Sequence, residues 1–284
     1  MTPPDLPPAL VADRPAAADR AFVTLVTNAA YLPGALALLR SLRLTGTGAD
    51  LAVMHRGLDA AQQDQLRALG ARLIRAELLD TSEAFDLAHA RDALHARAAF
   101  LRGAKPDFHT PLDNFVKLRL WQLDYARCVF IDADALVLRP VDKLFDFPEF
   151  CAAPNVYDGL DGFGRMNSGV FTARPDPATF AAMMAHLDRP GVFWRRTDQT
   201  FLQDFFPDWQ GLSIHHNLLQ YVWTHMPALW DWGQVRILHF QYEKPWEDHP
   251  KAQALRPLID LWRHVAAGGA MPDLTALPAP PVPA

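Results

Sequence analysis

The sequence has little of several residue types, and each scarcity excludes a class of protein. Its 284 residues include two cysteines, Cys128 and Cys151, both in strongly apolar runs, so we expect small buried side chains rather than a disulfide framework. Lysine is scarce, with five against 22 arginines, and the net charge of −5 leaves no basic excess for binding nucleic acid. No run approaches 18 uncharged apolar residues, and the N-terminal segment lacks a signal-peptide core. We therefore expect no transmembrane segment and a cytoplasmic protein.

Proline is concentrated at the two ends of the chain. Ten of the 24 prolines fall within the first 15 and the last 13 residues, where hydrophobic periodicity is absent. Segments of this composition do not bury enough apolar surface to pack. We therefore expect mobile tails at 1–19 and 269–284, and a single domain from 20 to 268.

Between these ends, short apolar runs alternate with segments of helical spacing. The runs at 21–27, 51–55 and 71–75 are strand-like, whereas 34–43 and 60–69 have apolar residues at helical intervals. This alternation predicts an α/β domain whose mainly parallel sheet is covered by helices on both faces. Further helices are expected at 113–123 (with Asp113 as N-cap), 177–187, 197–206 and 255–266, and a last strand at 235–240.

Residues 81–112 interrupt the alternation. They are rich in alanine, arginine and histidine, and we expect them to be helical through residue 104 and to end in a turn at 106–111. Such a helical insertion fits either a solvated surface or a lid over a bound acceptor.

The most apolar run of the chain ends in two aspartates. In CVFIDADALVL, at 128–138, three apolar residues lead directly to Asp132 and Asp134. Ligands bind at the carboxyl ends of strands in open α/β sheets, and carboxylate oxygens suit Mg²⁺ or Mn²⁺. An unliganded loop is the simpler alternative. A phosphatase with Asp132 as nucleophile is disfavoured, because its motif opens the domain and carries Thr or Val where Leu136 stands here.

The segment MNSGVF, at 166–171, adds polar groups just before another apolar run. Asn167 and Ser168 offer amide and hydroxyl partners for sugar hydroxyl groups. Gly169 permits a close approach of the backbone.

Two further segments carry charge at the ends of expected elements. Thr197 is the expected cap of a helix whose first turn holds Asp198 and Gln199, and compensation of the helix dipole is the alternative role of Asp198. His239 lies at a strand end and Lys244 follows in a turn that contains proline. A buried core histidine and a solvated lysine are the plain alternatives. An ammonium beside a histidine at a strand end would also suit a diphosphate leaving group.

Taken together and in this order, these segments resemble glycosyltransferase family 8, including its glycogenin and galactinol-synthase-like members. The resemblance runs from about 21 to 246 and is broken chiefly by 81–112. It is carried by FVTLVTNAAY at 22–31, NFVKLRLW at 114–121, FIDADALVL at 130–138, NSGVF at 167–171, DQTFL at 198–202 and HF…KPW at 239–246.

The resemblance implies a GT-A fold with a Rossmann-like, mixed sheet in one domain. It also implies a UDP-sugar donor, Mn²⁺ or Mg²⁺ as the metal ion, and retention of the anomeric configuration. Carried over by position, the implied metal ligands are Asp132, Asp134 and His239, and the implied uridine pocket is Leu25, Thr27, Asn28 and Tyr31. Donor-sugar contacts fall on Lys117, Asn167, Ser168, Asp198 and Gln199, with Ala133 and Gly169 beside them, and the diphosphate contact on Lys244. Asp198 and Lys244 are the implied catalytic residues.

The chain also departs from the pattern of the family. The glycine usual between the last histidine and lysine is missing, and Arg195 and Phe108 stand where glycogenin has an aspartate and an arginine. Glucose, galactose and N-acetylglucosamine therefore all remain candidates for the donor sugar.

We expect transfer of a hexose from a UDP-sugar to a separate carbohydrate or other hydroxyl acceptor. The alternatives are a non-catalytic nucleotide-sugar-binding protein and a self-glucosylating primer of the glycogenin type. The primer is disfavoured because Trp223, on an expected extended segment, stands near the place of the acceptor tyrosine. A homo-oligomer is compatible with the sequence.

Overall fold

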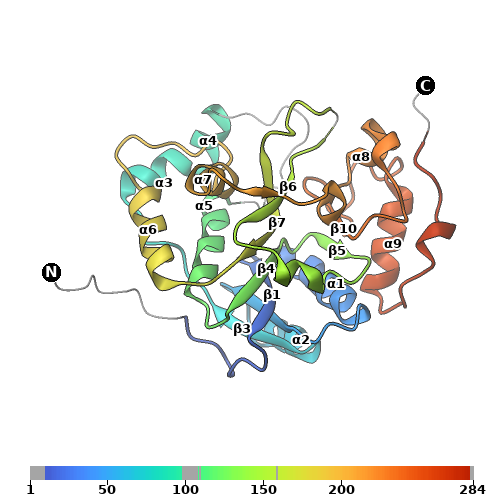
Figure 1. The fold of residues 1–284 in the computed structure, drawn as a ribbon, viewed down its shortest axis with the longest axis horizontal. Helices are drawn as coiled ribbons and strands as arrows, with labels where there is room; N and C mark the ends of the chain where they lie inside the picture. Colours follow the sequence, from blue (N-terminus) through green and yellow to red (C-terminus); the bar gives the residue numbers. More distant parts are fainter. Residues whose placement is uncertain (1–9, 98–107, 109, 158, 282–284) are drawn as a thin grey trace.

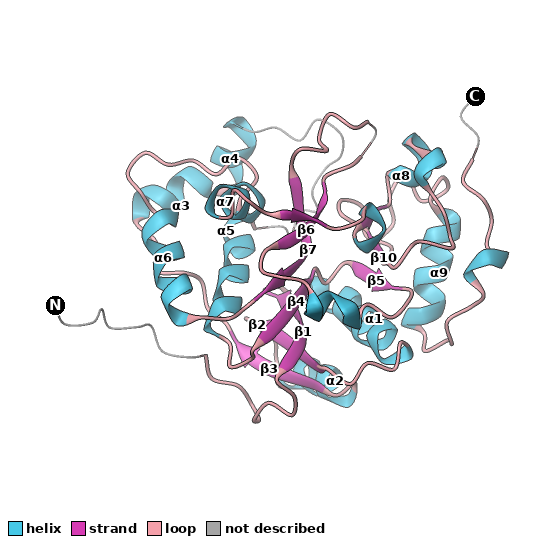
Figure 2. Cartoon of the chain, viewed as in Figure 1, coloured by secondary structure: helices cyan, strands magenta, loops and turns pink. Residues whose placement is uncertain are grey.

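The computed structural model describes residues 10–97, 108, 110–157 and 159–281. Two sheets meet near the centre of the molecule, with helices packed around them (Figures 1 and 2). The larger sheet has the strand order β3-β2-β1-β4-β7-β6-β8 and the smaller one has the order β5-β10-β9. The strands are β1 (Arg20–Val26), β2 (Asp50–His55), β3 (Ala71–Arg75), β4 (Arg127–Ile131), β5 (Ala135–Val137), β6 (Cys151–Pro154), β7 (Met166–Ala173), β8 (Gln210–Gly211), β9 (Leu218–Leu219) and β10 (Ile237–His239).

The larger sheet is mixed but mainly parallel, as predicted. Strands β3, β2, β1 and β4 run parallel to one another, whereas β7 is antiparallel to both β4 and β6. The α/β fold class predicted from the sequence is therefore confirmed.

Each face of this sheet is covered by a different set of helices, because side chains alternate along every strand. In β1, Ala21 and Val23 face a core shared with α6 (Pro177–Leu187), α7 (Asp198–Phe205) and the 3₁₀ helix η2 (Phe115–Gln122). Phe22 faces the opposite core, which is shared with α1 (Leu32–Leu44) and α2 (Ala60–Ala68). Burial on both faces explains why the sequence of β1 is apolar almost throughout.

Local signals fix where several helices begin. Asp59 and Gln62 form a reciprocal capping box at the start of α2. Asp176 accepts the N–H of Thr179 at the start of α6, and a proline follows in the first turn. The remaining helices are α3 (Glu83–His89), α4 (Arg91–Arg97), α5 (Pro111–Asn114), α8 (Val222–His225) and α9 (Arg256–Ala266), and the other 3₁₀ helices are η1 (Ala29–Tyr31), η3 (Asp142–Asp146), η4 (Ile214–His216), η5 (Pro227–Leu229) and η6 (Leu274–Ala276).

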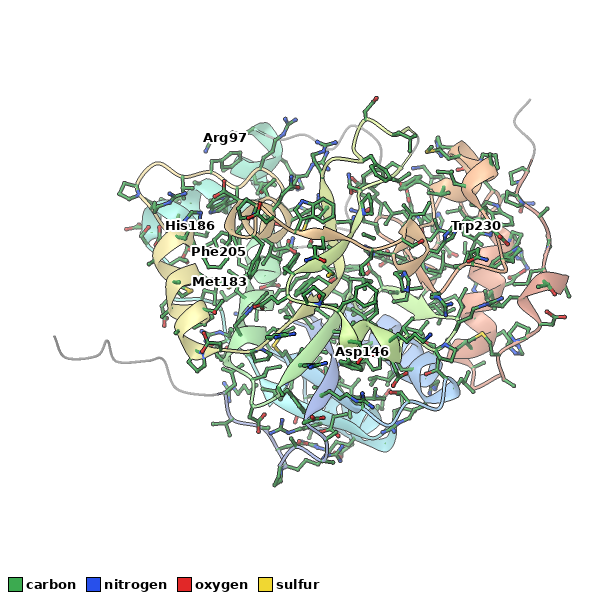
Figure 3. The ribbon with its side chains drawn as sticks, in the orientation of Figure 1. Arg97, Asp146, Met183, His186, Phe205 and Trp230 are labelled. Atoms are coloured by element: carbon green, nitrogen blue, oxygen red, sulfur yellow. The ribbon has the colours of Figure 1, made fainter. Side chains whose placement is uncertain are left out.

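The smaller sheet has its own core, which is rich in tryptophan. Trp223, Trp230 and Trp232 pack edge to face or tilted, with ring centroids 5.0–5.9 Å apart. Helix α9 closes this core and also contacts α1. Figure 3 shows Trp230 beside α8 and α9, on the side of the molecule opposite Phe205 and His186. The smaller sheet is thus fastened to the larger one through α1.

One expectation about local structure is wrong. The segment 113–123 is not a single α-helix capped by Asp113, because it forms the short α5, begun at Thr110, and then the 3₁₀ helix η2. Seven residues of η2 are buried around the whole of its circumference, and this tertiary packing overrides the amphipathic pattern. In the described part of the N-terminal segment, Ala12 pairs with Ile74 and the Asp13 carboxylate accepts the N–H of Leu73. The C-terminal segment likewise contacts the domain, where Pro278 accepts the indole N–H of Trp232.

The predicted helical insertion is described only in part. Helices α3 and α4 cover 83–97, and the segment from 98 to 107 lies outside the described residues. The His89 side chain is fully buried, with its Nδ1 2.9 Å from the Phe85 carbonyl oxygen. Its Nε2 accepts the backbone N–H of Trp194 at 2.9 Å. The insertion is therefore fastened to the segment that leads into α7.

Within the described ranges, no helix combines the length and the apolar character that crossing a bilayer requires.

Candidate active site

The turn between β4 and β5 brings two carboxylates to the junction of the two sheets. Strand β4 ends at Ile131, and the N–H of Ala135 then donates to the Asp132 carbonyl oxygen, which closes a turn around Asp132 and Asp134. Strand β5 pairs antiparallel with β10, and in that register His239 lies opposite Ala135. The pairing of the smaller sheet therefore places an imidazole beside both carboxylates.

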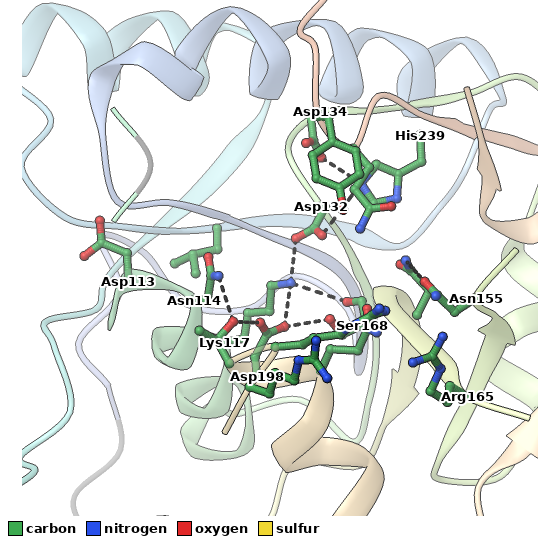
Figure 4. A pocket seen from close by; sticks show the side chains of 18 of the residues that line it. Asp113, Asn114, Lys117, Asp132, Asp134, Asn155, Arg165, Ser168, Asp198 and His239 are labelled. Carbon is green, nitrogen blue, oxygen red and sulfur yellow. Dashed lines mark hydrogen bonds and ion pairs between the residues drawn. The ribbon is translucent and has the colours of Figure 1, made fainter. Parts of the chain in front are cut away.

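The three side chains can present ligand atoms within 4.8 Å of one another. Nε2 of His239 lies 3.1 Å from Oδ1 of Asp134 and 3.9 Å from Oδ2 of Asp132. Asp134 and His239 are buried, and about a quarter of the Asp132 side chain is exposed. Figure 4 shows the three groups converging at one end of the pocket.

A chain of buried amides determines which nitrogen of His239 carries the proton. The backbone N–H of Gly169 donates to a side-chain atom of Asn167, which must therefore be the amide oxygen Oδ1. The group of Asn217 that contacts the same oxygen must then be its amide nitrogen, which donates to it. Oδ1 of Asn217 then faces Nδ1 of His239 at 2.8 Å, and Nδ1 must be the protonated nitrogen. Nε2, the other ring nitrogen, faces the two carboxylates, and an imidazole oriented in this way suits a divalent cation held between them.

Gly169 leaves the room that this imidazole occupies. A Cβ at this position would lie 2.4 Å from Cε1 of His239, which is closer than side chains approach one another. The close approach expected at Gly169 is thus an approach to the histidine ring.

Lys244 is folded into the same cluster. Its side chain is 1% exposed, and its ammonium donates to Asp134 and to the carbonyl oxygens of Phe240 and Gln241. Burial acts to raise the pKa of Asp134, but Lys244 and His239 outweigh it and hold that pKa well below its usual value. Asp134 is therefore a buried anion.

Lys117 links the Asp132 carboxylate to the start of α7. Its ammonium lies 2.9 Å from Asp132 and 2.9 Å from Asp198, whose carboxylate also accepts the Ser168 hydroxyl at 2.7 Å. Burial acts to lower the pKa of Lys117, but the two carboxylates outweigh it and the net pKa is raised. Burial raises the pKa of Asp132, with a further contribution from Asp134, although Lys117 opposes it.

The backbone just before α7 is strained. Thr197 has a φ of 48°, a conformation that a β-branched residue rarely adopts. Its hydroxyl accepts from Asn114 and donates to Asp198, each at 2.9 Å, and these bonds hold the strained residue in place. Thr197 therefore orients Asp198 instead of capping the helix through its side chain.

These groups line a cavity of about 270 Å³, shown from close by in Figure 4. Of the residues singled out in the sequence, those that line it are Leu25, Thr27, Tyr31, Lys117, Asp132, Ala133, Asp134, Asn167, Ser168, Asp198, Gln199 and His239. Asn28, Gly169 and Lys244 do not line it. The Asn28 side chain accepts from Ala30 and donates to the Phe108 carbonyl oxygen, so it supports the wall behind Tyr31.

Other residues of the cavity were not identified from the sequence as site residues. Asn155 extends the amide chain by accepting from Asn167 at 3.1 Å, and Asn217, behind the cavity wall, completes it. Arg165 and Arg196 also line the cavity. No local signal in the sequence marks Asn217, because the pairing of β9 with β10 is what brings it to His239.

Comparison with known proteins gives a consistent result. The family model for Glycosyl transferase family 8 matches residues 22–156. Glycogenin-2 of Homo sapiens is 36% identical over 80% of the chain, and UDP-glucuronate:xylan alpha-glucuronosyltransferase 1 of Arabidopsis thaliana is 28% identical over 83%. The chain spans 44% and 34% of the lengths of these two relatives, respectively.

A solved structure shares the fold. The galactosyltransferase LgtC, in complex with donor and acceptor sugar analogues, aligns with a TM-score of 0.59 and 14% identity, covering 88% of this chain and 97% of its own. The GT-A fold predicted from the sequence is confirmed.

Proposed function

The chain belongs to glycosyltransferase family 8, and from that premise we propose that it transfers a hexosyl unit from a UDP-sugar to a separate hydroxyl acceptor, using a divalent metal ion and retaining the anomeric configuration. The observation that carries this proposal is the convergence of Asp132, Asp134 and Nε2 of His239 on one point of the cavity.

The donor atoms at this point fit a divalent cation. Two carboxylates and one imidazole suit Mn²⁺, and Mg²⁺ is the alternative. When bound, such an ion supplies charge neutralisation for a departing diphosphate. The amide of Asn217 holds the imidazole so that Nε2 faces the site.

The two buried lysines have separate roles in this proposal. Lys244 stabilises negative charge on the leaving UDP, and to do so it exchanges part of its contact with Asp134 for the diphosphate. Lys117 holds Asp198 at 2.9 Å, so that the carboxylate can orient the donor sugar near its anomeric carbon. Tyr31 lines the cavity near this cluster, with its ring centroid 5.7 Å from the Lys244 ammonium, and offers its ring to the uracil base.

A separate acceptor is favoured by the surroundings of Trp223. This residue has no hydroxyl group, and it lies in α8, 1% exposed, rather than on an extended segment. The neighbouring Tyr221 hydroxyl donates to Glu243 at 2.6 Å and receives a hydrogen bond from Lys251. A tyrosine held in this way is not poised for self-glycosylation.

The proposal is tested by incubating the purified chain with a panel of UDP-sugars, with Mn²⁺ and with EDTA. We expect metal-dependent release of UDP and loss of this activity in Asp198→Asn. Equal release in EDTA would refute the metal assignment. Metal-dependent binding of UDP without any turnover would instead favour the non-catalytic nucleotide-sugar-binding protein. A ladder of hexose additions in intact-mass spectra, mapping to Tyr221 or Thr224, would favour the self-glucosylating primer.

A further inference from the structure

Three arginines line the same cavity and are not used by the proposed reaction. Arg165, Arg195 and Arg196 all contribute to its wall. The two buried lysines are bound to carboxylates, as described above. In contrast, no carboxylate within the described ranges forms an ion pair with any of the three guanidinium groups.

The arginines come from two segments that meet at this part of the cavity. Arg165 closes the loop between β6 and β7, where its carbonyl oxygen accepts the N–H of Asn155 at 2.8 Å. Arg195 and Arg196 directly precede the strained Thr197, and the charge of Arg196 acts on Tyr157, which belongs to the first of these segments. Figure 4 shows Arg165 beside Asn155, away from Asp134 and on the same side as Ser168.

Among the described residues, positive charge exceeds negative charge in this part of the cavity. Arg165 and Arg195 are exposed and Arg196 is half-buried, and of the described residues of the same loop Asp161 is the acidic one that lines the cavity. Like charges gathered around one cavity repel each other unless an anion lies among them. Because Lys244 and the metal ligands are assigned to the diphosphate end, the arginines are available to a second anionic group.

We propose that this cavity binds a sugar that carries a carboxylate, a hexuronate, and that Arg165, Arg195 and Arg196 hold that carboxylate. The proposal rests on the proposed function, because it concerns the sugar that the same site would hold. Guanidinium groups bind carboxylates through paired N–H donors, which an uncharged C6 hydroxyl group cannot match. The carboxylate can belong to the donor sugar or to the acceptor, and the chemistry of recognition is the same in both cases.

The test compares ligands that differ only at C6. Isothermal titration with Mn²⁺ measures UDP, UDP-glucose and UDP-glucuronate on the wild-type chain, and then glucuronate and glucose on the chain saturated with UDP. We expect at least a tenfold preference for the carboxylated member of one pair, which is about 1.4 kcal/mol. A preference in the first pair assigns the carboxylate to the donor, and one in the second pair assigns it to the acceptor.

Variants connect such a preference to the arginines. Arg165→Gln, Arg195→Gln and Arg196→Gln should each reduce it several-fold while leaving the affinity for UDP unchanged. Arg263→Gln is the matched control, because Arg263 is exposed on α9, outside the cavity. The preference should also weaken as ionic strength rises, since two of the arginines are exposed.

The outcomes separate the two proposals. Equal affinity for both members of each pair, or a preference unaffected by the three variants, overturns the hexuronate inference while metal-dependent UDP binding still supports the proposed function. Failure of UDP itself to bind with Mn²⁺ overturns the proposed function and the inference that rests on it.

Discussion

Replacement of Asp134 by asparagine should destabilise the protein although it barely changes the shape of the side chain. Lys244 is 1% exposed and its ammonium is bonded to this carboxylate. Removing one partner of a buried ion pair leaves the other charge uncompensated, which costs about 3–5 kcal/mol. At roughly 2–4 °C per kcal/mol, the midpoint of thermal unfolding should fall by roughly 6–20 °C.

The complementary change tests the same pair from its other side. Lys244→Met keeps most of the apolar stem but leaves Asp134 with only His239 as a cationic or hydrogen-bonding side-chain partner among the described residues. The double variant Asp134→Asn/Lys244→Met buries neither charge. We therefore expect the free energy of unfolding of the double variant to exceed, by about 2 kcal/mol or more, the value obtained by adding the two single effects.

Urea denaturation in EDTA measures all four proteins under one condition and keeps metal binding out of the comparison. The linear extrapolation gives the free energy of unfolding of each, and the slope should be the same for all four. If the single effects add to within about 0.5 kcal/mol, the two side chains are not coupled and the ion pair does not stabilise the fold.

Three further predictions concern the groups around the site. Gly169→Ala should lower the affinity for Mn²⁺ at least tenfold, because its Cβ displaces the His239 ring; Gly211→Ala, where a Cβ meets open space, is the control. Asn217→Ala should weaken Mn²⁺ binding about 10–100-fold in calorimetric titration, since it removes the hydrogen-bond partner of Nδ1 of His239. Unchanged affinity would show that the amide chain does not contribute to metal binding. Burial lowers the pKa of His89 from 6.5, so the unfolded chain takes up this proton first. The stability that a neutral His89 provides should be complete above pH 6.5 and fall as pH decreases toward the folded pKa, and His89→Gln should flatten that part of the measured profile.

The sequence predicted best those elements whose signals are local. The helix at 60–69 and the apolar run of β1 are predicted correctly to within one or two residues, because neighbouring residues decide both. The segment 115–122 is different. Its turns are buried on all sides and Lys117 must reach two carboxylates from distant segments, so its 3₁₀ form depends on contacts that the local pattern does not contain.

The same distinction applies to the candidate site. Asp132 and Asp134 were recognised because both follow a buried strand directly in the sequence. Asn217 was missed because an asparagine before a two-residue strand has meaning only once β9 pairs with β10 and brings it to His239. For the same reason the primary structure did not reveal that Lys244 is buried against Asp134.

The pairing of β5 with β10 has a consequence for the order in which the protein is made. Asp134 and Lys244 stand 110 positions apart in the chain, and His239, the third of the proposed metal ligands, is carried by a strand almost as distant. Closing a loop of that length costs chain entropy, so pairings of this kind form late in folding. During synthesis, a ribosome-bound chain that ends before residue 239 holds both aspartates but lacks this histidine. The proposed metal site would therefore be completed only after β10 has been synthesised and has paired with β5.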